Sequence, residues 1–137
     1  MTDQRRLEIS LLILRLSTGA FLVVWTSLKF FRPEWMVNIF QNAYGQAWVT
    51  QDLAFLIGTI QGLLVLAFLI GFARRITYGL VTLMHATGVI ASIPGLINFT
   101  QYPNNLMWTA VGTLGALVAL YIMRDRDNLL SVSGRNK

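Results

Sequence analysis

Residues Leu7 to Phe31 have the sequence LEISLLILRLSTGAFLVVWTSLKFF, an apolar run that contains two cations. As one helix that rises about 1.5 Å per residue, this run is long enough to cross the roughly 30 Å hydrocarbon core of a bilayer. Arg15, Leu22 and Lys29 follow one another at steps of seven residues, so they share one face of that helix. A charge within such a segment is costly unless it reaches an interface or a partner, and it therefore marks a candidate functional site.

The composition is typical of an integral membrane protein. Of the 137 residues, 55% are hydrophobic and 12% are charged, and the mean hydropathy is +0.57. An ordinary soluble domain has about 25% charged residues. A spanning helix needs ~20 apolar residues, and runs near this length occupy residues 7–31, 53–73, 76–97 and 106–123. We therefore expect a single all-α domain over residues 1–137, a bundle of four transmembrane helices.

The positions of the cations predict the orientation of this bundle. Lys29 and Arg32 lie toward one side, and eight cations lie toward the other: Arg5, Arg6, Arg74, Arg75, Arg124, Arg126, Arg135 and Lys137. The positive-inside rule then predicts a multi-pass protein of the plasma membrane with both termini in the cytoplasm. Because contacts with anionic headgroups account for the net charge of +5, we expect membrane lipids and not nucleic acid as partners.

The loop after the first run contains an amphipathic pattern. Pro33 opens this loop, and pairs of apolar residues recur every four residues from Trp35 to Trp48. The spacing predicts a short helix that lies in the external membrane interface. It is either an aromatic anchor or a lid over a cavity between the spans. The segment after the fourth run, RDRDNLLSVSGRNK from Arg124, is polar, and we expect it to fray.

Further polar residues occur inside the predicted spans. Gln61 lies within the pattern Gly58-x-x-x-Gly62, whose small residues let two helices approach closely, and His85 lies on a polar stripe of the third run. The helical rise puts both side chains near the depth of Arg15. We therefore predict that five residues bind a ligand in one internal cavity: Arg15, Gln61 and His85 along its wall, and Lys29 and Trp25 at its outer mouth.

Both cations of the first run also have structural explanations. Arg15 can snorkel toward the cytoplasm, or it can pair with one of three carboxylates, Glu8, Asp125 or Asp127. The side chain of Lys29 leans back over Trp25, where we expect a cation–π contact.

The sequence restricts the chemistry of a ligand. The chain has no cysteine and one histidine, His85, whereas a six-coordinate b-type haem needs two axial ligands. No Asp or Glu lies at depth in the predicted spans, so we expect neither a metal site nor a self-sufficient haem site. A polar, aromatic-lined cavity with a cation suits a quinone or a lipid headgroup. No nucleophile–base pair is recognisable, so we predict no catalytic residue and rank a free-standing enzyme last.

Short motifs are distributed over the first three runs: Leu14-Arg15-Leu16 with Gly19 and Lys29, Gln61-Gly62-Leu63 with Leu69-Ile70-Gly71 and Arg74, and His85-Ala86-Thr87. These motifs resemble those of the DoxX family of small four-helix bacterial membrane proteins. The resemblance implies a place in the bacterial inner membrane and an association with membrane redox systems. The family includes a subunit similar to the small chain of thiosulfate:quinone oxidoreductase and partners of oxidative-stress proteins. Family members typically carry Glu where this chain has Gln61, and a neutral amide cannot relay a proton.

Together these observations favour an accessory subunit of a membrane redox assembly, which contributes to a quinone- or lipid-binding pocket. Two alternatives stay open. A small anion or solute transporter or pore would use Arg15 and Lys29 to draw an anion inward. A purely structural subunit would use its glycine-rich faces to pack against other helices. In each case we expect other membrane subunits or further copies of the chain as partners.

Overall fold

The computed structural model describes residues 1–134, and every regular element in them is helical. The long helices are α1 (Asp3–Phe31), α3 (Gln51–Leu69), α4 (Arg74–Ala91) and α6 (Trp108–Ile122). Short segments join or follow them: α2 (Pro33–Asn38), the π-helical turn η1 (Ile39–Ala43), α5 (Ile93–Ile97), and the 3₁₀ turns η2 (Asn104–Met107), η3 (Arg124–Arg126) and η4 (Val132–Gly134). The predicted all-α fold is confirmed. Arg135 and Lys137, two of the cations on which the predicted orientation rests, lie outside the described residues.

Three helical segments are long and apolar enough to cross a membrane: α1, α3, and the stretch Asn104–Ile122 that joins η2 to α6. Helix α4 is not among them. It begins with Arg74 and Arg75 and carries the polar stripe that includes His85, and these residues interrupt its apolar sequence. The predicted third run, residues 76–97, is also divided into α4 and α5. Pro94 explains this division, because it has no backbone N–H to continue the hydrogen-bond pattern of α4.

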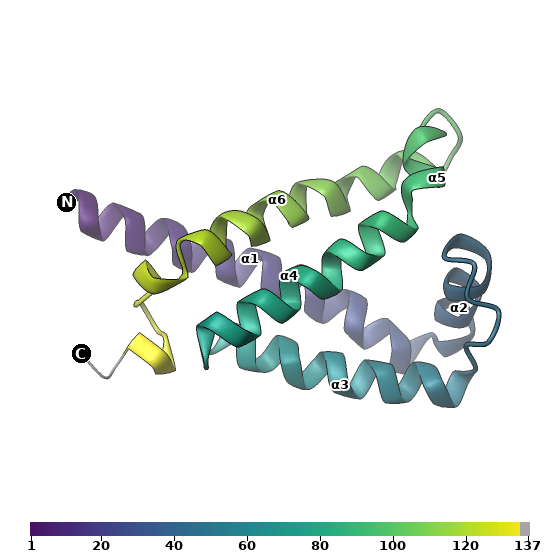
Figure 1. The fold of residues 1–137 in the computed structure, drawn as a ribbon, viewed down its shortest axis with the longest axis horizontal. Helices are drawn as coiled ribbons and strands as arrows, with labels where there is room; N and C mark the ends of the chain where they lie inside the picture. Colours follow the sequence, from purple (N-terminus) through teal and green to yellow (C-terminus); the bar gives the residue numbers. More distant parts are fainter. Residues whose placement is uncertain (135–137) are drawn as a thin grey trace.

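The elements gather at two ends of the molecule (Figure 1). At the terminal end lie the N-terminus, the turn Ile70–Ala73 between α3 and α4, and the turns η3 and η4. At the opposite end, the loop end, lie α2, η1, α5 and η2. Helix α1 packs against α3 and α6, and α4 packs against the same two helices. Helices α3 and α4 diverge toward the loop end, so the bundle is tighter at the terminal end (Figure 1).

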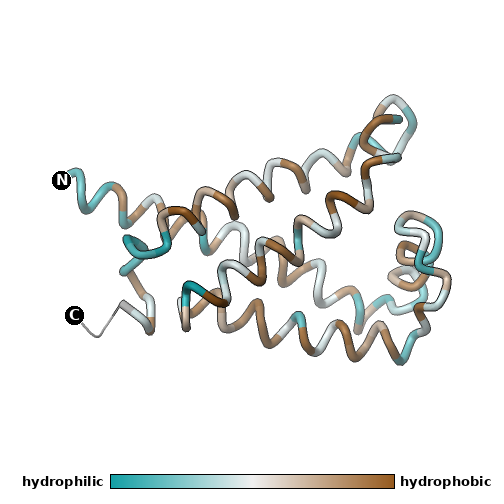
Figure 2. The backbone as a smooth tube through the Cα atoms, viewed as in Figure 1, coloured by the Kyte–Doolittle hydropathy of each residue, from teal (hydrophilic) through white to brown (hydrophobic). Residues whose placement is uncertain are grey.

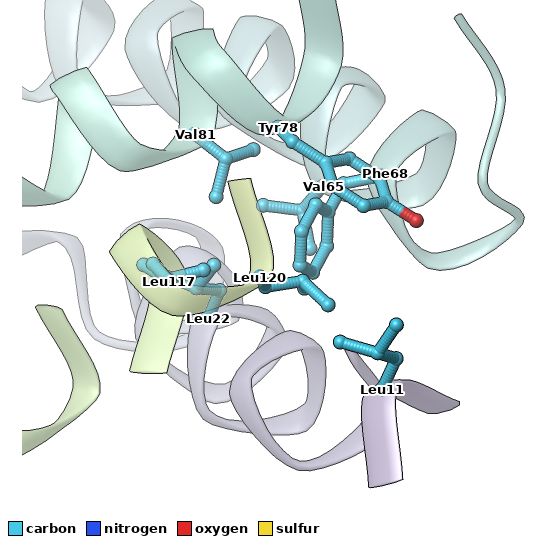
Figure 3. Packing of buried hydrophobic residues seen from close by; sticks show 8 residues of the cluster. All are labelled: Leu11, Leu22, Val65, Phe68, Tyr78, Val81, Leu117 and Leu120. Carbon is cyan, nitrogen blue, oxygen red and sulfur yellow. The ribbon is translucent and has the colours of Figure 1, made fainter. Parts of the chain in front are cut away.

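All four long helices contribute to one apolar core (Figure 3). The rings of Phe68 and Tyr78 lie edge to face within it, with centroids 4.9 Å apart. The remaining members are aliphatic: Leu11, Leu22, Val65, Val81, Leu117 and Leu120. Large apolar side chains such as Ile13, Ile60 and Leu83 are also exposed on the outside of the helices. Hydrophilic residues concentrate at the start of α1 and in the turns (Figure 2). The helices thus present apolar surface both inward and outward.

The C-terminal segment folds back onto the bundle. Backbone N–H groups of Val132 and Ser133 donate to Ile70 O (2.9 Å) and Gly71 O (3.3 Å), and the Ser133 hydroxyl accepts from Ala73 N (3.0 Å). The expectation that this segment frays is therefore wrong for the described residues. The reason is that α3 ends at a turn whose last carbonyls lack partners in the helix, and the C-terminal segment supplies the donors.

The helix of the first loop is shorter than predicted. It continues from Pro33 through α2 and η1 but ends at Ala43, and the segment up to Trp48 is not helical. Gly45 follows with φ +66°, a left-handed conformation that favours glycine and ends a helix. The apolar periodicity alone did not reveal this stop.

Candidate functional site

Arg15 is fully buried, and both ends of its planar guanidinium are bonded. Its Nη1 donates to the Tyr78 hydroxyl (3.2 Å) and lies 3.2 Å from Asp127 Oδ2. Its Nη2 donates to two backbone carbonyls of the C-terminal segment, Leu129 O (2.5 Å) and Leu130 O (3.1 Å). We call Arg15, Tyr78 and Asp127 the Arg15 network.

The Arg15 network is closed by a hydrogen bond between its other two members. The Tyr78 hydroxyl donates to Asp127 Oδ2 at 2.7 Å, and the Asp127 side chain is fully buried. Figure 3 shows the Tyr78 ring among the core side chains, with its hydroxyl directed away from them. Two atoms of the network, Arg15 Nε and Asp127 Oδ1, have no partner within residues 1–134. Opposite charges with directional hydrogen bonds can remain buried, and each then depends on the other.

The sequence left several explanations of Arg15 open, and the structure selects pairing with Asp127. Arg74 adds to this arrangement, because its Nη1 donates to the Asp127 carbonyl and to Asn128 Oδ1 (3.2 Å). The bonds of Arg15 thus connect α1 to α4 and to the C-terminal segment, and do not connect it to Gln61 or His85. In this structure Arg15 holds the terminal end together.

Lys29 lies on the same face of α1 as Arg15, near the loop end. Only 5% of its surface is exposed, yet within residues 1–134 no carboxylate lies within 4 Å of its ammonium and no group hydrogen-bonds to it. Its stem packs against α3 where Gly58 permits a close approach, since a Cβ placed on Gly58 would lie 2.9 Å from Lys29 Cβ. The predicted close-packing role of the Gly58 and Gly62 pattern is thereby confirmed at Gly58.

Trp25, one turn before Lys29, belongs to an aromatic group at the loop end. It is 37% exposed and stacks on Trp35 of α2, with centroids 6.0 Å apart and planes at 22°. The expected cation–π contact between Lys29 and Trp25 is not formed. Instead Arg32 lies over the Trp35 ring at 5.9 Å.

The segment α2–η1 also reaches α4. The Tyr44 hydroxyl, directly after η1, lies 3.8 Å from the position of a Cβ on Gly88. Burial raises the pKa of Tyr44, so its hydroxyl stays protonated. Between η1 and α5 lies a groove of about 370 Å³, which Asn42, Ser92 and Asn98 help to line. The segment thus packs over the loop end, and whether it serves as anchor or lid stays a prediction.

Gln61 lies at the middle of α3, and its side chain lines a second groove, separate from the one between η1 and α5. This groove has a volume of about 470 Å³ and runs between α3 and α4. Its lining is apolar except for Gln61 and Thr87: the other members are Ile57, Ile60, Leu64, Leu80, Leu83 and Met84. The Thr87 hydroxyl donates to Leu83 O (2.8 Å), whereas the Gln61 amide has no hydrogen-bond partner within the part of the chain that the structure describes.

His85 faces α6. Its Nε2 lies 2.8 Å from Ala110 O, and its ring meets Phe21 edge to face, with centroids 5.7 Å apart. Because a carbonyl only accepts, Nε2 carries the proton in this contact. His85 thus connects α4 to α6 in the half of the bundle nearer the loop end.

The structure places the five predicted site residues in four surroundings. Trp25 and Lys29 lie together at the loop end, while Arg15, Gln61 and His85 each lie elsewhere, as described above. Sequence reasoning gave no role to Tyr78 or Thr26, although both lie on faces that it had identified. Within residues 1–134, no three His, Asp or Glu side chains lie close enough together to bind a metal ion.

Comparison of the chain with protein-family models, with curated proteins and with solved structures finds no match.

Proposed function

We propose that the protein is a four-span integral membrane protein that serves as an accessory subunit of a membrane redox assembly, with a quinone bound in the groove between α3 and α4. Membership of the DoxX family and a place in the bacterial inner membrane, with both termini in the cytoplasm, belong to this proposal. They rest on the motifs and on the distribution of cations.

The outer face of α4 supports a fourth span. Ile76, Leu80, Leu83 and Ile90 are between 47% and 65% exposed on this helix. Its polar stripe faces inward, since Tyr78 is buried and His85 contacts α6. A helix whose apolar side is outside and whose polar side is inside fits a lipid environment and not water. Together with the three helices that are long and apolar enough, α4 completes the bundle.

The observation that carries the quinone proposal is the free amide of Gln61. A polar group in hydrocarbon without a hydrogen bond costs several kcal/mol, so a ligand that supplies an acceptor stabilises the protein. A quinone carbonyl accepts from such an amide, and its ring and isoprenoid tail match the apolar lining of Leu64, Leu83 and Met84. This chemistry links the groove to a redox assembly without requiring that the chain catalyse a reaction.

The test is the affinity of the purified chain for a short-chain benzoquinone in uncharged detergent. We expect Gln61→Leu, which keeps the volume but removes the amide, to weaken binding about tenfold, the cost of one lost hydrogen bond in an apolar site. Thr59→Val is the matched control, because Thr59 is exposed on the other side of α3 and donates to Phe55 O. Equal affinity of Gln61→Leu and the parent would remove the proposed site, and displacement of the quinone by uncharged lipid would make the groove a lipid site.

A further inference from the structure

We propose that Lys29 and Thr26 form a second site, which binds a phosphate group at the loop end beneath α2. This site is independent of the groove at Gln61, and it involves no chemical reaction. It is inferred from two polar side chains that are more than nine-tenths buried and lack partners.

Thr26 and Lys29 are adjacent on the buried face of α1. Lys29 follows Thr26 by three positions, and residues at this spacing lie side by side on a helix. Thr26 is 7% exposed and Lys29 is 5% exposed, and neither side chain forms a hydrogen bond within residues 1–134. The methyl group of Thr26 contacts α3, with Cγ2 at 3.6 Å from the Cβ position of Gly62, so its hydroxyl is on another side.

Thr26 is an exception among the hydroxyl groups of the helices. A serine or threonine inside a helix usually bonds to the carbonyl three or four residues before it. Its counterparts on α1 do so: Ser10 donates to Arg6 O, Ser17 and Thr18 donate to Leu14 O, and Ser27 donates to Val24 O. The Thr26 hydroxyl is therefore available to a bound group.

The surroundings of Lys29 do not neutralise its charge. The buried hydrophobic residues at this end of the bundle are Met36 on α2, Val49 before α3, Ala54 on α3 and Leu96 on α5. The nearby acidic residues Glu34 and Asp52 are exposed, and neither forms an ion pair with Lys29. Lys29 Nζ is not among the fully buried atoms without a partner, so the ammonium reaches the surface of the bundle, where it has no counter-ion within residues 1–134 and an anion can approach it.

Phosphate fits this site better than a neutral ligand. An ammonium and a hydroxyl are two donors and can bond to two oxygens of one phosphate. Lys29 lies near the end of α1, beside the stacked Trp25 and Trp35, and such tryptophans occupy the headgroup level of a membrane. The phosphate of a lipid headgroup lies at this level, and free phosphate from the aqueous side has the same chemistry.

The experiment follows thermal unfolding of the full chain in an uncharged detergent. It is titrated in parallel with dioctanoyl phosphatidylglycerol, with dioctanoylglycerol, which lacks the phosphate, and with inorganic phosphate at constant ionic strength. We expect phosphatidylglycerol to raise the unfolding temperature and dioctanoylglycerol to leave it unchanged. Lys29→Met should raise the half-saturating concentration about tenfold or more, which corresponds to the loss of a charge-assisted hydrogen bond.

Three further variants make the result specific. Thr26→Val keeps the contact with Gly62 and should weaken the response, and Lys29→Arg should keep most of it. Arg32→Met is the matched control, because Arg32 is an exposed cation at the same end of α1, and it should respond like the parent. Thr26→Val and Lys29→Arg also test the site if Lys29→Met does not fold.

The outcomes separate the sources of phosphate from the failure of the proposal. An equal response to inorganic phosphate would support the site and identify a soluble anion as its ligand. An equal loss in Arg32→Met and Lys29→Met would overturn the proposal in favour of a general surface charge effect. If the parent protein responded to neither phosphate compound, the proposal would also be overturned. Pairing of Lys29 with a carboxylate of another subunit would then be the remaining explanation.

Discussion

Arg15 and Lys29 are two buried cations on one face of α1, yet their surroundings differ completely. Arg15 has an acidic partner, a phenol and two carbonyls around it, supplied by α4 and the C-terminal segment. Lys29 packs against Gly58 of α3 and has no counter-ion within residues 1–134. The same spacing in the sequence thus produced a structural charge at the terminal end and an unsatisfied one at the loop end.

This difference shows that burial alone does not identify a functional charge. A buried cation with a carboxylate counter-ion inside the fold is explained by folding, because removing it would leave that carboxylate buried without its partner. A buried cation without partners is not explained by the fold and points to something outside the chain. The contrast therefore directs the search for a ligand away from Arg15 and toward Lys29.

The largest effect is expected from breaking the Arg15 network. Arg15→Ala leaves Asp127 buried without its counter-ion and should lower the free energy of unfolding by about 3–5 kcal/mol. Arg15→Lys should also be destabilising, because one ammonium cannot reach both Asp127 Oδ2 and the two tail carbonyls as the planar guanidinium does. Thermal and denaturant unfolding in detergent measure both values.

Two controls sharpen this first prediction. Arg5→Ala removes an exposed ion pair with Glu8 (3.8 Å) and should cost about 0–1 kcal/mol. The double variant Arg15→Met with Asp127→Leu removes both charges and should be more stable than Arg15→Ala alone. If Arg15→Lys behaved like the parent, the cation would be snorkelling and the network would contribute little.

The next largest loss of stability is expected at Gly71, which lies against the Arg15 side chain. Gly71 has φ +66°, and a Cβ there would collide with Ser131 Oγ and Arg15 Nη1. Gly71→Ala should therefore destabilise the protein by about 1–3 kcal/mol, by strain and by displacement of the C-terminal segment. Gly112→Ala on α6 is the matched control, because nothing lies within 4 Å of its Cβ position, and it should be neutral or stabilising by up to about 1 kcal/mol. Similar losses in both variants would argue against the folded-back segment.

At the loop end, by contrast, we expect that removing the buried cation does not lower the stability of the protein. Without added phosphate, Lys29→Met replaces a largely buried lysine that has no partner within residues 1–134 by an apolar side chain of similar length, so it should leave stability unchanged or raise it by about 1 kcal/mol. The measurement is the unfolding temperature of the delipidated protein, compared with that of Arg15→Met under the same conditions. A loss as large as that of Arg15→Met would mean that Lys29 has a partner within the chain, and the comparison of the two cations would fail.

Much of the fold could be predicted from the sequence, because apolar length and periodicity determine where the long helices form. The hydroxyl of Thr2 accepts from Arg5 N and caps α1, and the hydroxyl of Thr50 accepts from Leu53 N and caps α3. Both helices begin slightly before the predicted positions. The end of α4 near Pro94 follows from the proline itself, whereas the short helix α5 lies in a segment that the sequence predicts as a loop. The end of η1 was missed because its signal is a single glycine, Gly45.

The candidate site was less accessible to sequence reasoning. The faces of the helices were identified well enough to mark Arg15 and Lys29, and Asp127 was one of three candidate partners of Arg15, but the sequence did not select it from them. The C-terminal segment is polar, and such a composition is typical of a frayed tail, so its role became visible only through the bonds to Ile70 and Gly71. Depth estimates put Arg15 and His85 at one level, but they do not determine the direction in which each side chain points.

The smallest effect, at His85, tests the one cavity that the sequence predicted. Since His85 Nε2 bonds to Ala110 O, His85→Leu removes one contact between α4 and α6 at nearly constant volume. A polar bond between spans contributes about 0.6 kcal/mol on average, so the expected loss in stability is of that order.

The informative measurement is quinone affinity, which should remain at the parent value because His85 is absent from the lining of the Gln61 groove. A joint loss of affinity in His85→Leu and Gln61→Leu would instead unite these residues in one site. Part of the internal cavity predicted from helical depth would then form when the ligand binds. The useful comparison would no longer be between Arg15 and Lys29, but between a ligand site at the middle of the bundle and the Arg15 network at its terminal end.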